Sequence, residues 1–228
     1  MNPLVWISEQ DAPDTFPSVE CAMVDPNGLL AIGGDLSSER LIAAYRRGIF
    51  PWYSRGQPIL WWSPDPRAIL IPTDMKIARS LAKTLRNAEF EVRVDTAFDA
   101  VMRACGAHRP EGTWISRDMR VAYSELHELK YAHSIEVWRA GELVGGLYGV
   151  SVGRVFFGES MFSRARDASK VALKHLCDRL RAAEFALIDC QMATAHLQSL
   201  GAKLIPRTDF CALVAEQSAI PVTSEVWT

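Results

Sequence analysis

The sequence predicts an α+β fold, in which a small N-terminal domain precedes a larger domain built on a mixed, largely antiparallel sheet flanked by helices. Three observations predict this class. A meander of three strand-like segments spans residues 134–158, and a long amphipathic segment and a buried strand follow it. Proline and tryptophan crowd residues 49–67, which separate that region from the N-terminal part. We therefore expect domains at residues 1–65 and 66–228.

The N-terminal domain is predicted to contain a helix at residues 38–47. Ser37 or Ser38 can cap its first turn, and Arg46 and Arg47 stand in its last turn, where positive charge suits the helix dipole. Gly48 follows as a terminator. The preceding residues, 1–34, are expected to be loop-rich, because prolines stand at positions 3, 13, 17 and 26.

The segment at residues 49–67 holds four prolines, at 51, 58, 64 and 66, and three tryptophans, at 52, 61 and 62. Proline removes a backbone donor, so this density disfavours a long helix or a central strand. Tryptophan side chains are costly to leave in a mobile linker. We expect an ordered, aromatic-rich loop that joins the two domains.

Residues 74–88 are predicted to form a helix with a basic face and an apolar face of Ile77, Leu81 and Leu85. Four cations share the basic face, because they recur at spacings of three and four residues: Lys76, Arg79, Lys83 and Arg86. Such a face is commonly just solvated. It carries a single sign, however, and residues 40–62 are also acid-free. Two basic stretches without acidic residues, together with nearby tryptophans, also fit a surface that binds nucleic acid.

The remaining elements follow from local periodicity. We expect a strand at 90–94, a helix at 97–105, a loop at 108–116 and a helix at 117–130. Three strands follow at 134–138, 143–150 and 155–158, then a helix from Asp167 or Ser169 to about residue 184, a strand at 187–190 and a helix from about 193. The order β-β-β-α-β is typical of a GNAT-type acetyltransferase domain.

Composition excludes several classes of protein. The chain has 25 Lys and Arg against 27 Asp and Glu, so any nucleic acid must be bound by a local patch. Five cysteines without a C-x-x-C pair, and five scattered histidines, predict no metal site. No apolar run approaches the roughly 20 residues that span a bilayer, and no signal peptide is evident, so we expect a cytoplasmic protein.

Three polar residues stand in apolar surroundings. Asp189 and Gln191 are two apart on a predicted strand, so they point the same way and Cys190 points the other way. They can converge on one ligand, or Asp189 can simply tether the next helix. Glu159 stands among Phe and Met residues, where a carboxylate needs a partner or a cationic ligand, unless it is merely an exposed acid at a strand end.

Six stretches occur in collinear order: GLLAIGGDLSSERLIAAYRRGIFPW, ILWWSPDPRA, EGTWIS, HELKYAHSIEVWRAGELVGGLYGV, FFGESMFSRARDASKVAL and LIDCQ…SLGA. Over residues 28–209 they resemble the bacterial leucyl/phenylalanyl-tRNA–protein transferase family. The resemblance implies transfer of leucine, phenylalanine or methionine from aminoacyl-tRNA to the α-amine of proteins that begin with Arg or Lys. It implies degradation of those proteins by the N-degron pathway, an acetyltransferase-like domain, and neither metal nor cofactor.

The resemblance also assigns residues. It implies that Asp189 and Gln191 are catalytic and that Glu159 acts with them. The aminoacyl pocket is expected to draw on Phe156, Met161, Leu173 and Ile188. The terminal adenosine is expected to lie near Trp52 and Trp114, with Tyr45 nearby. The basic helix is expected to contact tRNA phosphates, and the protein is expected to act as a monomer.

Two other functions stay open. A conventional N-acetyltransferase would need a glycine-rich turn for coenzyme A, and residues 163–169, which occupy that place, contain no glycine. A non-catalytic RNA-binding protein would use the basic helix and the tryptophans but would leave Asp189, Gln191 and Glu159 without a purpose. P-loop and dinucleotide-binding motifs are absent from the sequence.

Overall fold

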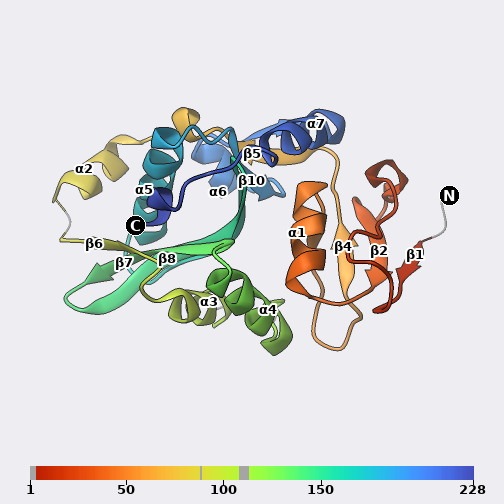
Figure 1. Ribbon diagram of the computed structural model, residues 1–228. Helices are drawn as coiled ribbons and strands as arrows, with labels where there is room; N and C mark the ends of the chain where they lie inside the picture. Colours follow the sequence, from red (N-terminus) through yellow and green to blue (C-terminus); the bar gives the residue numbers. More distant parts are fainter. Residues whose placement is uncertain (1–3, 88, 108–112) are drawn as a thin grey trace.

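The computed structural model describes residues 4–87, 89–107 and 113–228, which form two sheets connected by a shared core (Figure 1). The first five residues of the loop expected at 108–116 lie outside the described residues. Within these ranges no helix combines the length and apolar character needed to cross a bilayer.

The smaller sheet consists of β1 (Val5–Ile7), β2 (Leu29–Gly33), β4 (Leu60–Trp62) and β3 (Phe50–Pro51), in that order. The expected loops at residues 1–34 and 49–67 therefore each contain two strands. Pro58 and Pro64 flank β4 instead of interrupting it, and Pro51 lies on the edge strand β3, where a missing donor costs little. Trp61 is fully buried in β4, and its Nε1 donates to the Gly33 carbonyl over 2.8 Å.

Helix α1 (Ser38–Arg46) forms where the sequence predicts it and lies between the two sheets (Figure 1). Gly48 follows in the left-handed region with φ of +72°. Leu41, Ala44 and Tyr45 are buried in a core cluster that also contains residues of the larger sheet. One hydrophobic core therefore continues from the N-terminal sheet into the rest of the chain.

The larger sheet has seven strands in the order β11-β5-β10-β9-β8-β7-β6, and the α+β class is confirmed. They are β5 (Arg67–Leu70), β6 (Glu91–Val94), β7 (Ala132–Arg139), β8 (Glu142–Val152), β9 (Val155–Ser163), β10 (Leu187–Gln191) and β11 (Lys203–Ile205). Among the described strands of this sheet only β9 and β10 pair in parallel, because helix α5 (Ala168–Ala182) makes the crossover between them. The predicted meander and the β-β-β-α-β order are present.

Helices cover both faces of this sheet. Helix α5 packs on one face, while α3 (Phe98–Gly106) and α4 (Arg117–Glu128) pack on the other (Figure 1). The remaining helices are α2 (Arg79–Asn87), α6 (Ala195–Ser199) and α7 (Arg207–Gln217), with 3-10 turns at Val19–Cys21, Pro72–Asp74 and Ser224–Trp227. Strand β11 and helix α7 were not expected from the sequence.

The helix predicted at residues 74–88 begins later, at Arg79. The segment before it is held in a non-helical form by the loop after α6, because the Lys76 amide donates to the Leu200 carbonyl over 2.8 Å. Lys76 therefore lies outside the helix that carries the other three cations. Ile77, expected on the apolar face, is 40% exposed for the same reason, whereas Leu81 is buried.

Candidate active site

A cavity of about 320 Å³ opens where β9 and β10 diverge. The two strands pair as far as Phe157 and Asp189, after which β9 continues along β8 and β10 continues along β5. Backbone groups beyond that point do not close the gap, so side chains line it. The lining residues used below are Trp52, Trp114, Phe156, Glu159, Met161, Leu173, Ile188, Cys190, Gln191 and His196.

Bulges shape both strands at this point. In β9 the pairing with β8 shifts between Gly158 and Ser160, so Glu159 is the extra residue. In β10 the pairing with β5 shifts between Asp189 and Gln191, and Gln191 has a left-handed φ of +61°. A bulge turns a side chain away from its regular direction. Glu159, which the sequence placed at the end of a strand, therefore lies inside β9 and meets Gln191.

Asp189 is fully buried and forms an ion pair that the sequence analysis missed. Arg67 donates from Nε to Asp189 Oδ1 over 2.8 Å and from Nη2 to Oδ2 over 2.7 Å. The guanidinium lies between the rings of Phe50 and Phe210, at 4.7 and 4.5 Å from their centroids. Its Nη1 donates to the Gly48 carbonyl over 3.1 Å. This bidentate geometry fixes the carboxylate and compensates its charge.

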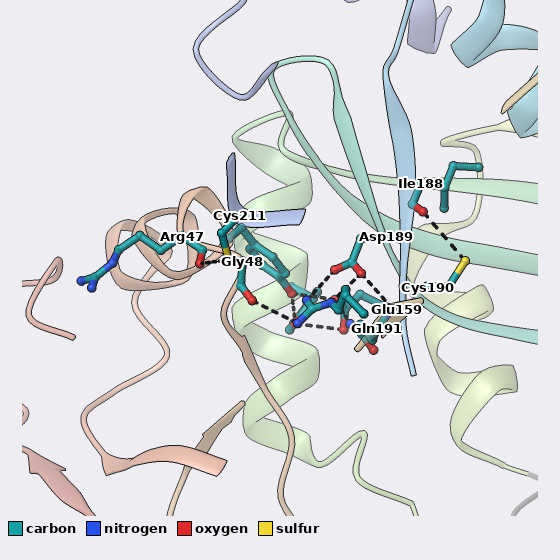
Figure 2. Close-up of polar contacts among 11 residues, drawn as sticks. Arg47, Gly48, Glu159, Ile188, Asp189, Cys190, Gln191 and Cys211 are labelled. Carbon is teal, nitrogen blue, oxygen red and sulfur yellow. Dashed lines mark hydrogen bonds and ion pairs between the residues drawn. The ribbon is translucent and has the colours of Figure 1, made fainter. Parts of the chain in front are cut away.

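The same carboxylate holds Gln191. The Gln191 backbone amide donates to Asp189 Oδ1 over 2.8 Å, which supports the strained left-handed backbone of that residue. Figure 2 shows Asp189 on one side of β10 and Cys190 on the other, as the strand alternation predicts. Burial raises the pKa of the Cys190 thiol, with a smaller contribution from Asp189, so the thiol stays protonated and is a poor nucleophile.

Glu159 accepts three hydrogen bonds in a buried setting. Tyr45 donates to Oε1 over 2.7 Å, Gln191 Nε2 donates to the same oxygen over 3.1 Å, and Tyr123 donates to Oε2 over 3.1 Å. Burial raises the pKa of the Glu159 carboxyl to about 7, and the negative charge of Asp189 adds to this, while the two tyrosine hydrogen bonds act in the opposite direction. The carboxyl therefore titrates near neutral pH.

Tyr45, which was expected near the terminal adenosine, is not among the described residues that line the cavity. It is fully buried on α1 behind Glu159, so it is inaccessible for stacking with an adenosine. Its hydroxyl instead contacts both Glu159 and Tyr123 of α4, with 2.5 Å between the two hydroxyl oxygens. Tyr123 was not singled out in the sequence, where it reads as a core position of an amphipathic helix.

The other predicted pocket residues are brought together. Phe156, Met161, Leu173 and Ile188 all line the cavity, from strands β9 and β10 and helix α5. Trp52 and Trp114 line it as well; Trp52 is 37% exposed and packs edge-on against Trp62, with 5.6 Å between ring centroids. The cavity thus combines an apolar lining, two tryptophans and the Glu159–Gln191 pair.

The predicted phosphate-binding cations do not line the cavity. Lys76, Arg79, Lys83 and Arg86 are all exposed. The Lys76 backbone bonds to the end of α6, whose residue His196 lines the cavity. The second acid-free stretch is different: Arg40 is fully buried and paired with Asp35, and Arg47 donates to the carbonyls of residues 14, 16 and 17. Residues 40–62 therefore present fewer free cations than expected.

No group of His, Cys, Asp and Glu among the described residues could hold a metal ion.

Two family models match the chain. The one described as "Leucyl/phenylalanyl-tRNA protein transferase" matches residues 69–215, and that of its N-terminal domain matches residues 34–65.

Curated relatives with the name leucyl/phenylalanyl-tRNA–protein transferase are similar over most of the chain. One from Thiobacillus denitrificans is 62% identical over 93% of this chain and 94% of its own length. Another, from Nitrosomonas europaea, is 56% identical over 93% of this chain and 91% of its own length. A GCN5-related N-acetyltransferase-like structure from Streptococcus suis matches with a TM-score of 0.36 and 15% identity, over 71% of this chain and 61% of that one.

Proposed function

The chain belongs to the leucyl/phenylalanyl-tRNA–protein transferase family and is an aminoacyltransferase, and we propose that it transfers leucine, phenylalanine or methionine from aminoacyl-tRNA to proteins with N-terminal Arg or Lys. The product is a new peptide bond at the acceptor α-amine, and the lengthened protein enters the N-degron pathway. The observation that carries the proposal is the cavity between β9 and β10, in which an apolar lining adjoins the Glu159–Gln191 pair.

The donor is an ester that is already activated, so the reaction needs positioning more than strong acid–base chemistry. The acceptor α-amine has a reference pKa of about 7.7 to 8.0, which leaves a usable neutral fraction at neutral pH. Holding reacting atoms in near-attack geometry can contribute about 7 to 11 kcal/mol. No metal or cofactor is required for this chemistry.

Gln191 is assigned to orient the attacking amine. Its Nε2 is engaged by Glu159, whereas no described residue donates to its Oε1, which is therefore free to accept a hydrogen bond from the amine. Asp189, itself fixed by Arg67, holds the Gln191 backbone. Glu159 supplies negative charge that attracts the basic acceptor terminus.

The apolar lining of Phe156, Met161, Leu173 and Ile188 accommodates the aminoacyl side chain. One methylene in such a pocket changes binding by about 1 to 3 kcal/mol, so leucine, phenylalanine and methionine are discriminated only modestly. Trp52 and Trp114 offer faces on which the terminal adenosine can stack.

The exposed cations from Lys76 to Arg86 are assigned to tRNA phosphates, which carry most of the affinity and little sequence information. The reaction is placed in the cytoplasm, where aminoacyl-tRNA is available. The proposal has the protein act as a monomer.

The decisive experiment incubates the protein with labelled phenylalanyl-tRNA and a peptide that begins with Arg. We expect label at the peptide N-terminus, and none with a matched peptide whose first residue is Asp. Acetylation from acetyl-CoA would instead indicate a conventional acetyltransferase. Binding of tRNA without transfer to the Arg peptide would indicate a non-catalytic RNA-binding protein.

A further inference from the structure

The transfer reaction needs a group that takes a proton from the attacking amine, because attack on the ester carbon leaves the nitrogen positively charged. Gln191 has no basic atom suited to this. The carboxylate of Asp189 is engaged by Arg67 and the Gln191 amide. Burial raises the pKa of the Cys190 thiol, which therefore stays protonated. His196 lies on exposed α6, and no hydrogen bond joins it to Gln191 among the described residues. Glu159 is the cavity-lining carboxyl that contacts the side chain of Gln191.

The surroundings of Glu159 have one place for an additional proton. Three oxygen–oxygen contacts join Glu159, Tyr45 and Tyr123 in a triangle, at 2.7, 3.1 and 2.5 Å. The two phenols supply only two hydrogens. With an ionised Glu159 both hydroxyls donate to the carboxylate, and no hydrogen remains between the two phenol oxygens. With a protonated Glu159 each of the three groups donates once and accepts once.

Resting on the proposed function, we propose that Glu159 accepts the proton of the attacking amine and that Tyr45 and Tyr123 position its carboxylate to store that proton. The amine nitrogen bonds to the ester carbon, and the carbonyl π electrons move to oxygen. Glu159 then removes one proton from the nitrogen. The carbonyl re-forms, the bond to ribose breaks with its electron pair on the ribose oxygen, and that oxygen receives the proton from Glu159.

The charged and titratable groups that the structure describes around this triangle come from five elements packed against it. The Asp189–Arg67 pair of β10 and β5 lies beside it, with Tyr45 from α1 and Tyr123 from α4; Tyr148 of β8 packs against Tyr123, with 5.9 Å between ring centroids. A carboxyl with a pKa of about 7 is matched to work near neutral pH, where a general base is most effective. The hydroxyls of Tyr45 and Tyr123 lower that pKa by donating to the ionised form, so their removal must raise it.

The test compares Glu159→Gln, Tyr45→Phe and Tyr123→Phe with the wild type in single-turnover transfer from bound phenylalanyl-tRNA, across pH. The control Tyr131→Phe removes a hydroxyl from a partly buried ring of the same core cluster. We expect Glu159→Gln to slow transfer about 10²- to 10⁴-fold at saturating acceptor and unchanged donor affinity, whatever the loss of its charge does to the acceptor KM. In both Phe variants of the triangle the acid limb of the profile moves to higher pH. The acceptor amine also titrates in this pH range, but it contributes equally to the acid limb of the wild type and of every variant. A shift between proteins therefore reports on the enzyme.

A readout independent of activity uses ¹³C NMR of side-chain-labelled glutamate, with the Glu159 signal identified by its loss in Glu159→Gln. We expect titration near pH 7 in the wild type and Tyr131→Phe, and at higher pH in the two Phe variants. The inference is overturned if this carboxyl titrates near 4.5, or if Glu159→Gln raises the acceptor KM and leaves the rate intact, which would leave Glu159 only a binding group. A wild type that transfers nothing refutes the proposed function instead.

Discussion

Replacing Arg67 by methionine should leave Asp189 as an uncompensated charge in the core. Both side chains are fully buried, and the substitution removes two hydrogen bonds to the carboxylate and one to the Gly48 carbonyl. Methionine has a similar length, so the loss is mainly electrostatic. Removing one partner of a buried pair costs about 3 to 5 kcal/mol, which is a large share of the stability of a typical domain.

The assay is equilibrium unfolding in urea, with the free energy of unfolding compared between the wild type, Arg67→Met and the double variant Arg67→Met/Asp189→Asn. The double variant removes the charge and keeps an oxygen that can accept from the Gln191 amide. We expect it to recover much of the loss, because a neutral replacement of a buried pair is often tolerated. A loss below about 1 kcal/mol in Arg67→Met, or no recovery in the double variant, would refute the assignment of this pair.

Three further predictions concern tRNA binding, adenosine stacking and the pH dependence of stability. Lys83→Ala/Arg86→Ala should weaken tRNA binding and reduce the slope of its salt dependence by about 1 to 2, and an unchanged slope would exclude α2 from the interface. Trp114→Ala should weaken binding of phenylalanyl-adenosine by about 1 to 3 kcal/mol in calorimetry, with a smaller effect from Trp62→Ala. Because the folded state binds a proton on Glu159 more tightly than the unfolded state, the stability of the wild type relative to Glu159→Gln should fall as pH rises from 4.5 through 7. The loss is about 3 kcal/mol in total, and parallel stability curves would contradict the raised pKa.

Local periodicity was enough to predict the meander, helix α5 and strand β10. Their apolar positions repeat at strand or helix spacing over long stretches, so packing and propensity agree. The small N-terminal sheet was missed because its strands have two to five residues and pair across distant segments, as β1 does with β2. The late start of α2 depends on the contact between Lys76 and Leu200, which no local pattern reveals.

Several residues that line the cavity were predicted through the family resemblance, but the interactions that set their chemistry were not. Arg67 and Asp189 are 122 positions apart, and Tyr45 is 114 positions from Glu159. The bulges that re-aim Glu159 and Gln191 depend on strand register, which is fixed only when neighbouring strands pair. An arginine at the end of a proline-rich segment and a tyrosine on a core helix face carry no local mark of their role.

The most direct test of the whole account measures transfer rate and donor affinity together for Gln191→Ala. In the proposed mechanism Gln191 orients the attacking amine, and the apolar lining holds the aminoacyl group of the donor. We therefore predict that the rate of transfer to an Arg-starting peptide falls sharply while the affinity for phenylalanyl-tRNA stays within a few-fold of the wild type. A parallel loss of rate and affinity, or a full rate in the variant, would contradict it.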